Sequence, residues 1–427
     1  MKKINIAIIG GGLRGTYTYS EYIYEKYENV EIIAVVEPKK GRRDLFKEKF
    51  NITDDNTFEN VDDMLASSLD VDGVIITSGD DSHFDNTKIF LAKGYNILLE
   101  NPLANTLDRI IKLKNLNNKK DGNLLMSCNT LINHEFFKLL QNIREQKELG
   151  ELISIEYDSN IGYSNFAHSY VRGNWRNHSD TSPLILNYSS QDISVLIDLV
   201  GGKCRKIASF GSLKHLNKGN FKPDMGANCF ICSIEEQCPY SAKNIYLESK
   251  GYLNNAVHIN PTKVNLEKIL SNGPYGRCIY ACDNNVVDNM LNILEFENGV
   301  TANLNIHAFS KEFDKKIRLI FSHGEVEGSI LDRKIKVRKF KDYKDEIIKL
   351  RNQNKYYEED LEFINIFINK LRDNNKSELK SDIDKDLDSH IIAFAAEYAR
   401  ISDEVVYISE FFEDAIKMTM NLESELS

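Results

Sequence analysis

Three glycines within Gly10-Gly11-Gly12-Leu13-Arg14-Gly15 have the spacing of a phosphate-binding turn. Gly10 permits a sharp exit from a strand, Gly12 lets the backbone approach a pyrophosphate, and Gly15 lets the next helix pack closely. An acidic residue about twenty positions further on can bind a ribose hydroxyl, which favours NAD over NADP. The predicted cofactor contacts of this turn are Gly10, Gly12, Leu13, Arg14, Gly15 and the acid Glu37.

The elements around the turn alternate between buried strands and helices. Apolar runs at 4–9 and 31–36 predict strands, with a helix over 16–27 between them. Such alternation predicts a parallel, doubly wound sheet, whose ligands lie at the carboxyl ends of the strands. Further strands are predicted over 71–77, 95–99 and 124–127, and helices over 84–93 and 106–117. The side chains expected at the nicotinamide end are Thr77, Ser78, His83, Glu100, Asn101, Pro102 and Asn129.

Size and charge set the broad class of the protein. A chain of 427 residues predicts two domains, which we place at 1–127 and 128–427. The net charge of −10 argues against nucleic acid as a partner, and no apolar run approaches the length of a membrane span. The short apolar opening does not fit a signal peptide, and seven cysteines without one favour a reducing compartment. We therefore expect a cytoplasmic protein without a membrane partner.

The second half is rich in predicted strands. An Asn298-Gly299 turn between two apolar runs predicts a β-hairpin. A polar excursion with most of the cysteines covers 214–282. Strands are predicted over 153–158, 290–296, 300–309, 317–321 and 328–331, and helices over 189–200, 363–371 and 391–401.

The order of these motifs resembles one known family. The glycine turn, Glu37, the Asp80-Asp81-Ser82-His83 loop and Glu100-Asn101-Pro102-Leu103-Ala104 are similar to the glucose–fructose oxidoreductase/inositol dehydrogenase (Gfo/Idh/MocA) family. The resemblance implies an α/β protein: an N-terminal Rossmann domain and a C-terminal α/β domain with a large, mostly antiparallel sheet that often forms homo-oligomers. It also implies NAD-dependent oxidation or reduction of a sugar or cyclitol hydroxyl, or NAD-assisted cleavage of a glycoside.

Three positions depart from the family pattern. Where the family has a lysine, an aspartate and a histidine, this chain has Asn101, Asn187 and Gln191. Amides can hydrogen-bond a sugar hydroxyl but cannot exchange a proton near neutral pH. Two hypotheses follow: an oxidoreductase with a degenerate catalytic site, and a cofactor- or sugar-binding member that acts as a sensor or as a partner subunit.

Other residues could carry out the proton transfer that the amides at these three positions cannot perform. His168, Tyr163 and Tyr188 are titratable candidates for proton transfer, although each could instead be a packing residue. In the stretch around Trp175, Arg172 and Arg176 could bind an anionic group while the indole stacks on a sugar ring. The alternative is a structural loop held by a buried Trp and Arg–carboxylate pairs. With Asn187 and Gln191, these three form the predicted substrate-binding set.

Five cysteines are clustered in the sequence. Short spacing between thiols suits a structural zinc site or, as an alternative, an iron–sulfur cluster, and free buried thiols are the third possibility. The predicted ligands are Cys229, Cys232, Cys238, Cys278 and Cys282.

Overall fold

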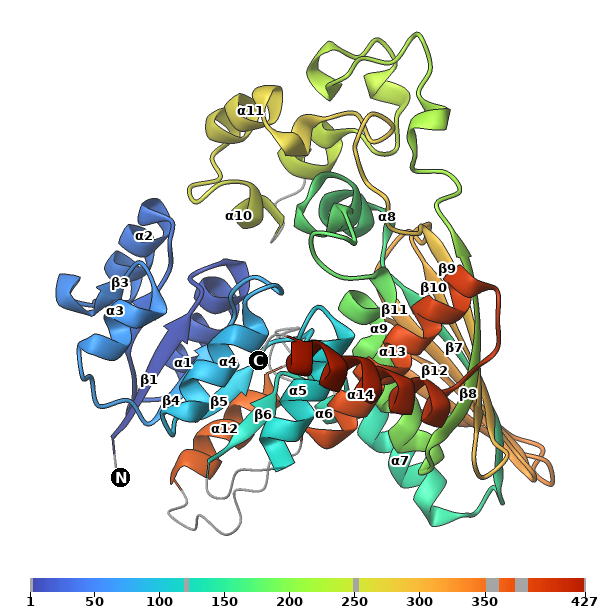
Figure 1. Ribbon diagram of the computed structural model, residues 1–427. Coiled ribbons are helices and arrows are strands. Elements are labelled where there is room, and N and C mark those ends of the chain that lie inside the picture. Colours follow the sequence, from blue (N-terminus) through green and yellow to red (C-terminus); the bar gives the residue numbers. More distant parts are fainter. Residues whose placement is uncertain (1–2, 119–122, 249–252, 351–360, 373–382, 426–427) are drawn as a thin grey trace. The chain divides into compact units, whose positions relative to one another are not determined.

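The computed structural model describes residues 3–118, 123–248, 253–350, 361–372 and 383–425. The chain divides into two compact units (Figure 1). The first comprises residues 1–134, 353–391 and 413–427, and the second comprises 135–352 and 392–412. The contiguous boundary predicted between residues 127 and 128 omits the two segments that return to the first unit.

The first unit is built on a six-stranded parallel sheet with the order β3-β2-β1-β4-β5-β6. Consecutive residues are fully buried in Val74–Ile76 of β4 and Ile97–Leu99 of β5, which requires apolar cover on both faces. The predicted parallel, doubly wound sheet is confirmed. Its strands are β1 (Ile4–Ile9), β2 (Val30–Val36), β3 (Thr57–Phe58), β4 (Gly73–Ile76), β5 (Asn96–Leu99) and β6 (Leu125–Ser127).

The helix after the glycine turn is not uniformly α-helical. It begins with a π-helical segment, Arg14–Ser20, and continues as α1 (Glu21–Lys26). The other helices of this unit are α2 (Lys40–Phe50), α3 (Val61–Ala66), α4 (His83–Ala92), α5 (Leu107–Asn118), α6 (Thr130–Asn133) and α12 (Glu362–Arg372).

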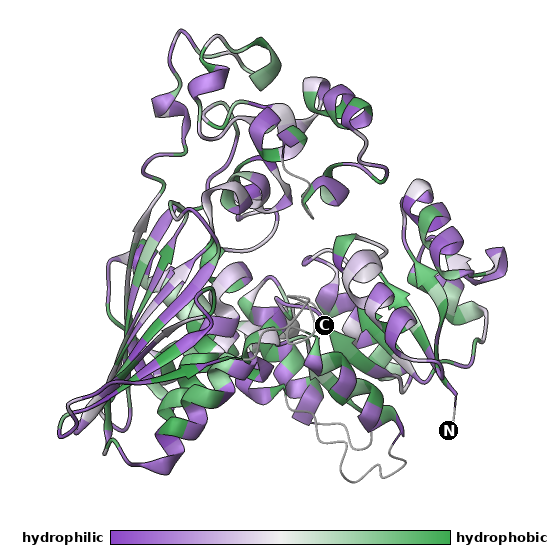
Figure 2. Ribbon diagram, turned by 180° about the vertical axis from the view of Figure 1, so that it is seen from behind, coloured by the Kyte–Doolittle hydropathy of each residue, from purple (hydrophilic) through white to green (hydrophobic). Residues whose placement is uncertain are grey.

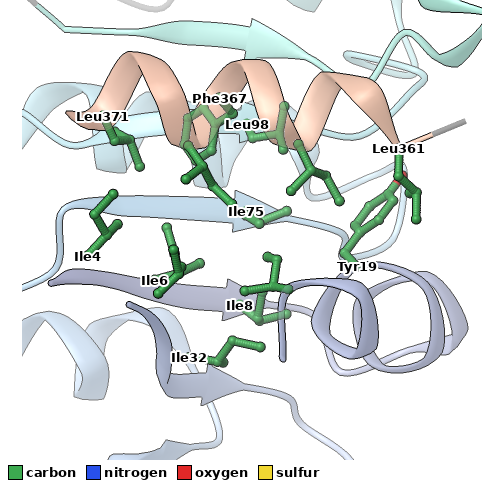
Figure 3. Close-up of a cluster of buried hydrophobic side chains, with 14 of the residues drawn as sticks. Ile4, Ile6, Ile8, Tyr19, Ile32, Ile75, Leu98, Leu361, Phe367 and Leu371 are labelled. Carbon is green, nitrogen blue, oxygen red and sulfur yellow. The ribbon is translucent and has the colours of Figure 1, made fainter. Parts of the chain in front are cut away.

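Helix α12 lies far along the sequence but completes the core of the first unit. Phe367 and Leu371 belong to the same buried cluster as Ile4, Ile6 and Ile75. Figure 3 shows α12 along the strands, with these side chains directed at one another. An apolar stripe at helical spacing explains why α12 is buried.

Gly73 of β4 allows this close packing, and a substitution there tests it. A Cβ at Gly73 would lie 2.9 Å from Phe367 Cζ and 3.0 Å from Leu371 Cδ1. We expect Gly73→Ala to lower the free energy of unfolding by about 1–3 kcal/mol through overpacking. Urea unfolding measures the loss, and adding Phe367→Leu should recover part of it. An unchanged stability of Gly73→Ala would contradict the packing described here.

The second unit contains a nine-stranded sheet with the order β14-β13-β12-β11-β7-β10-β9-β8-β15. Only the β7–β10 pair is parallel among its described strand pairs, so the predicted large, mostly antiparallel sheet is confirmed. Figure 2 shows hydrophilic and hydrophobic residues alternating along these strands, whereas the parallel sheet of the first unit is more uniformly hydrophobic. Its strands are β7 (Leu152–Asn160), β8 (Cys204–Ser212), β9 (Asn289–Phe296), β10 (Thr301–His307), β11 (Asp314–Phe321), β12 (Gly324–Ser329), β13 (Lys334–Lys339), β14 (Glu346–Lys349) and β15 (Val406–Tyr407).

Helices α7 and α9 pack on each other, and α9 contacts β7 and β10. The predicted excursion 214–282 falls between β8 and β9 and contains only short helices in its described part, apart from α11. The helices of this unit are α7 (Glu135–Gln146), α8 (Tyr163–Phe166), α9 (Leu184–Val200), α10 (Leu253–Val257) and α11 (Lys263–Asn272); α13 (Asp384–Ser402) and α14 (Ile408–Glu425) contribute to both units.

Candidate functional site

The glycine turn leaves space beside Gly12. A Cβ at Gly10, whose φ is +108°, would lie 2.6 Å from the backbone of Thr77 and Ser78. A Cβ at Gly15 would lie 2.2 Å from the carbonyl oxygen of Gly10, so the helix packs tightly on the end of β1. At Gly12 the nearest atom is 3.8 Å away, which leaves room for a phosphate to approach the backbone.

Glu37 follows β2 at the same edge of the sheet. It is only 4% exposed, and its Oε1 accepts a hydrogen bond from the backbone N–H of Lys39 at 2.9 Å. A Cβ at Gly11 would contact the Glu37 side chain at 3.4 Å, so the acid lies directly beside the glycine turn. This is where a ribose-binding carboxylate is needed.

His83 connects the ends of β4 and β5. Its Nδ1 lies 2.7 Å from the carbonyl oxygen of Pro102, and its Nε2 lies 3.0 Å from that of Ser78. Thr77 Oγ1 donates to the carbonyl of Gly10 at 2.7 Å, which joins β4 to the turn. These predicted cofactor residues therefore also hold the loops together.

Glu100 is held by three groups of the first unit. Arg14 Nε donates to its Oε1 at 2.8 Å, Tyr19 Oη donates to the same oxygen at 2.6 Å, and the backbone N–H of Asn101 donates to Oε2 at 2.8 Å. Burial alone would raise the pKa of Glu100, but the Arg14 charge and these hydrogen bonds bring the pKa below its ordinary value. Tyr19 was not a predicted site residue, and nothing in its local sequence pattern indicates this role.

Asn101 occupies the position at which the family pattern has a lysine. Its Nδ2 donates to the carbonyl of Cys128 at 3.0 Å, and its buried Oδ1 has no partner among the described residues. The side chain can therefore accept one further hydrogen bond, but it cannot take a proton.

Asn129 is already engaged by the protein. Its Oδ1 accepts from the backbone N–H of Ile132 at 3.3 Å, and its Nδ2 donates to Asp386 Oδ1 at 2.6 Å. His390, one turn after Asp386 on α13, accepts from the backbone N–H of Leu103 at 3.0 Å. Asp386 and His390 were missed because they lie more than 250 residues further along the chain.

Helix α9 of the second unit carries Asn187, Tyr188 and Gln191. Asn187 Oδ1 accepts from Tyr170 Oη at 2.6 Å, and Tyr188 Oη donates to the carbonyl of Asn160 at 2.9 Å. Burial raises the pKa of Tyr188 well above its ordinary value, and the nearby Asp192 charge raises it further. Tyr188 is thus a neutral phenol near pH 7, which makes proton abstraction by this group unfavourable.

A buried ion pair lies next to these residues and was not predicted. Lys315 Nζ of β11 donates to Asp192 Oδ2 at 2.8 Å, and the side chains are 3% and 0% exposed. Asp192 also accepts from Tyr157 at 2.7 Å and from Ser159 at 2.6 Å. Lys315 Nζ lies 4.2 Å from the ring centroid of Tyr188. The network fixes α9 on the sheet and places a charge beside Tyr188.

His168 and Tyr163 pack among aromatic rings; the ring centroid of Tyr163 lies 6.1 Å from that of Tyr240. His168 Nδ1 lies 2.9 Å from Tyr246 Oη, and the imidazole stacks on Tyr275 with a centroid distance of 4.8 Å. Burial, with a contribution from the Arg172 charge, lowers the pKa of His168 to about 4. The imidazole is therefore neutral at pH 7.

Arg172 and Arg176 also have partners within the second unit. Arg172 donates to the carbonyls of Arg277 at 2.8 Å and Tyr240 at 2.7 Å, and Arg176 Nε donates to Asp283 at 3.0 Å. Trp175 lies beside Tyr170, with a centroid distance of 6.5 Å. Of the contacts expected for a structural loop, the structure contains the Arg176–Asp283 pair, whereas Arg172 bonds backbone carbonyls and Trp175 is only partly buried.

Four of the five clustered cysteines line one cavity: Cys229, Cys232, Cys238 and Cys278. The fifth, Cys282, is not on its wall, and its Sγ donates to the carbonyl of Cys278 at 3.3 Å. Among the described residues, no three His, Cys, Asp or Glu side chains are placed to hold a single metal ion. The predicted structural zinc site is therefore not supported.

None of the helices in the described part of the chain combines the length and apolar character that crossing a membrane requires.

Comparison with known proteins gave one family match. Residues 4–127 match the model GFO_IDH_MocA, described as the oxidoreductase family with an NAD-binding Rossmann fold. No significant match was found among curated proteins.

Several solved structures share the fold over nearly the whole chain. Scyllo-inositol dehydrogenase from Lactobacillus casei, solved with NAD(H) and scyllo-inositol, has a TM-score of 0.67 and 16% identity, covering 96% of this chain and 100% of that chain. Myo-inositol 2-dehydrogenase from Lactobacillus plantarum has a TM-score of 0.65 and 14% identity, covering 95% of this chain and 99% of that chain. The WlbA dehydrogenase from Chromobacterium violaceum, solved with NADH and UDP-GlcNAcA, has a TM-score of 0.65 and 13% identity, covering 95% of this chain and 96% of that chain.

Proposed function

We propose that this chain, whose residues 4–127 belong to the NAD-binding Rossmann fold of the GFO_IDH_MocA oxidoreductase family, is an NAD-dependent oxidoreductase of a sugar, cyclitol or glycoside. The single observation that carries the proposal is the glycine turn, with open space at Gly12 and the buried Glu37 carboxylate beside Gly11. Sugar-type ligands in structures of the same fold support the substrate class.

Bound NAD would supply the acceptor or donor of a hydride. The backbone at Gly12 would bind the pyrophosphate, and Glu37 would accept a hydrogen bond from the ribose. Asn101, Asn187 and Gln191 each carry an amide that could hydrogen-bond a substrate hydroxyl, and none of the three can remove its proton. Loss of general-base catalysis costs about two to four orders of magnitude in rate, so turnover should be slow.

Replacing Glu37 tests the cofactor assignment. We expect Glu37→Ala to weaken NAD binding about 10- to 100-fold, because a hydrogen bond to a charged group contributes about 1.5–3 kcal/mol. Titration calorimetry with NAD and with NADP measures the affinity and the preference. Glu31→Ala is the matched control, since Glu31 is an exposed acid on β2, the strand that leads to Glu37. Equal NAD affinity in both variants would contradict the proposal.

The second candidate is a binding protein without turnover. The observation that favours it is the Asn101 side chain, which is held by the carbonyl of Cys128 and cannot carry a proton. Restoring Asn101→Lys, Asn187→Asp and Gln191→His together should raise turnover about 10²- to 10⁴-fold if the chain is an impaired enzyme. A redox assay with NAD and a panel of sugars measures this. Cofactor binding with no turnover before or after restoration would favour the sensor or partner-subunit role.

A cytoplasmic homo-oligomer is part of the proposal. The seven cysteines are all free thiols, as suits a reducing compartment. Phe210 of β8 and Leu291 and Ile293 of β9 are exposed apolar side chains on the large sheet, which suits a contact between copies.

A further inference from the structure

The first part of helix α13 belongs to the first unit and carries two buried polar side chains. Asp386 and His390 lie one turn apart, and they are 3% and 1% exposed. Buried polar side chains of native proteins have hydrogen-bond partners. The partners found here lie at and beyond the carboxyl ends of β5 and β6. The helix is thus bonded to the edge of the parallel sheet at which a ligand is expected.

His390 holds the segment that follows β5. Its Nε2 accepts a hydrogen bond from the backbone N–H of Leu103 at 3.0 Å, so the imidazole proton is on Nδ1, which donates to the carbonyl of Asp386 at 2.5 Å. Leu103 is fully buried, and a buried N–H group without an acceptor is unfavourable. The neutral imidazole therefore fixes the backbone two residues after Asn101.

Asp386 holds the end of β6. Its Oδ2 accepts a hydrogen bond from Ser127 Oγ, and its Oδ1 accepts one from Asn129 Nδ2 at 2.6 Å. The residue between these two, Cys128, provides the carbonyl oxygen to which Asn101 Nδ2 donates at 3.0 Å. Asp386 therefore fixes the backbone that orients the Asn101 amide.

The Asn101 amide held in this way has one acceptor atom to spare. Its Oδ1 is buried and has no hydrogen-bond partner among the described residues. A buried acceptor without a donor is unfavourable, so a ligand that brings a donor is favoured at this place.

The sheet order indicates which part of a dinucleotide this ligand group would be. The order β3-β2-β1-β4-β5-β6 reverses between β1 and β4, and each half of such a sheet binds one mononucleotide. The glycine turn and Glu37 follow β1 and β2, on the half that binds the adenosine. Asn101 follows β5, on the half that binds the nicotinamide nucleotide.

We propose that Asp386 and His390 are positioning residues for the nicotinamide half of the cofactor, a role that rests on the proposed function because it requires NAD to bind the first unit. Asn101 Oδ1 accepts a hydrogen bond from the nicotinamide nucleotide, and the two side chains of α13 fix the amide before the cofactor binds. Such preorganisation reduces the entropy lost on binding. Neither Asp386 nor His390 exchanges a proton in this role.

Two ligands separate this role from a general effect on folding. NAD contains both nucleotides, whereas ADP contains only the adenosine and the pyrophosphate, which bind at the glycine turn and Glu37. We expect His390→Leu to weaken NAD binding about 5- to 50-fold and to change ADP binding less than about twofold, measured by titration calorimetry on the full chain. Equal weakening of NAD and ADP would indicate a purely structural role and would overturn the proposal.

Three further variants complete the test. His390→Gln restores an acceptor for the Leu103 N–H and should keep NAD affinity within about threefold of wild type. Asp386→Asn leaves one oxygen for two hydrogen-bond donors and should lose NAD affinity selectively, even if His390→Leu fails to fold. Asp388→Asn is the matched control, since this acid of α13 is 51% exposed and should bind both ligands like wild type.

The outcomes distinguish the positioning role from the proposed function. Wild-type protein that binds neither NAD nor ADP would overturn both. Wild-type protein that binds NAD, with no selective loss in a folded Asp386→Asn variant or the same loss in Asp388→Asn, would overturn the positioning role alone. Circular dichroism shows which variants are folded.

Discussion

Lys315→Met is expected to lower the free energy of unfolding of the second unit by about 3–5 kcal/mol. Among the described residues, the substitution leaves the fully buried Asp192 carboxylate with the hydroxyls of Tyr157 and Ser159 as its hydrogen-bond donors. Removing one member of a buried ion pair costs more than the pair contributes, because the remaining charge is left in an apolar environment. Chemical unfolding followed by circular dichroism measures the loss.

Two further variants show whether the loss of stability comes from the unpaired charge of Asp192. Lys316→Met changes the neighbouring lysine, whose side chain is 58% exposed, and should stay within about 0.5 kcal/mol of wild type. Combining Lys315→Met with Asp192→Asn removes both charges and should recover much of the loss. If Lys315→Met and Lys316→Met lowered the free energy of unfolding by the same small amount, the ion pair would not be buried as described.

The stability of the protein is expected to fall as the pH drops from about 6.5 to about 4, and two buried histidines are the cause. Burial lowers the pKa of His390 to about 4, partly opposed by its bond to the Asp386 carbonyl, and burial likewise lowers the pKa of His168 to about 4. The unfolded chain therefore binds more protons than the folded chain in this window. Stability accordingly rises with pH there and is lost as the pH falls. Each histidine contributes up to about 3 kcal/mol.

The geometry at His390 gives this effect a specific test. Its Nε2 accepts a hydrogen bond from the Leu103 N–H, so protonation would destroy that bond. In denaturant unfolding at pH 7.5 and pH 5, His390→Gln should lose less stability between the two pH values than wild type. His323→Gln, at an exposed histidine, should follow wild type. Identical pH dependence of all three proteins would argue against a buried neutral imidazole at position 390.

The parts of the fold with strong local patterns could be predicted from the sequence. The buried run 4–9 and the glycines after it lead to the observed β1 and turn, because only glycine fits the positive φ at Gly10 and the close approach at Gly15. Weaker patterns were less accurate: the strand predicted at 328–331 is observed as β12 at Gly324–Ser329, and α2 and α7 were not predicted.

Long-range pairing could not be predicted. The apolar stripe of α12 predicts that one face is buried, but it does not specify the β1–β4 surface as its partner. Asp192 and Lys315 are 123 positions apart, and the local sequence around each of them does not indicate that its charged side chain is buried. The cysteine spacing indicated a cluster of thiols, yet only the folded chain separates Cys282 from the other four.

The late position of α12 has a consequence for biosynthesis. When residues 1–134 leave the ribosome, the helix that covers Ile4, Ile6 and Ile75 has not been translated. Until more than two hundred further residues emerge, an apolar face of the nascent domain stays uncovered and is a natural target for chaperones that recognise hydrophobic surface. A truncated gene ending before α12 should for the same reason yield an aggregation-prone product.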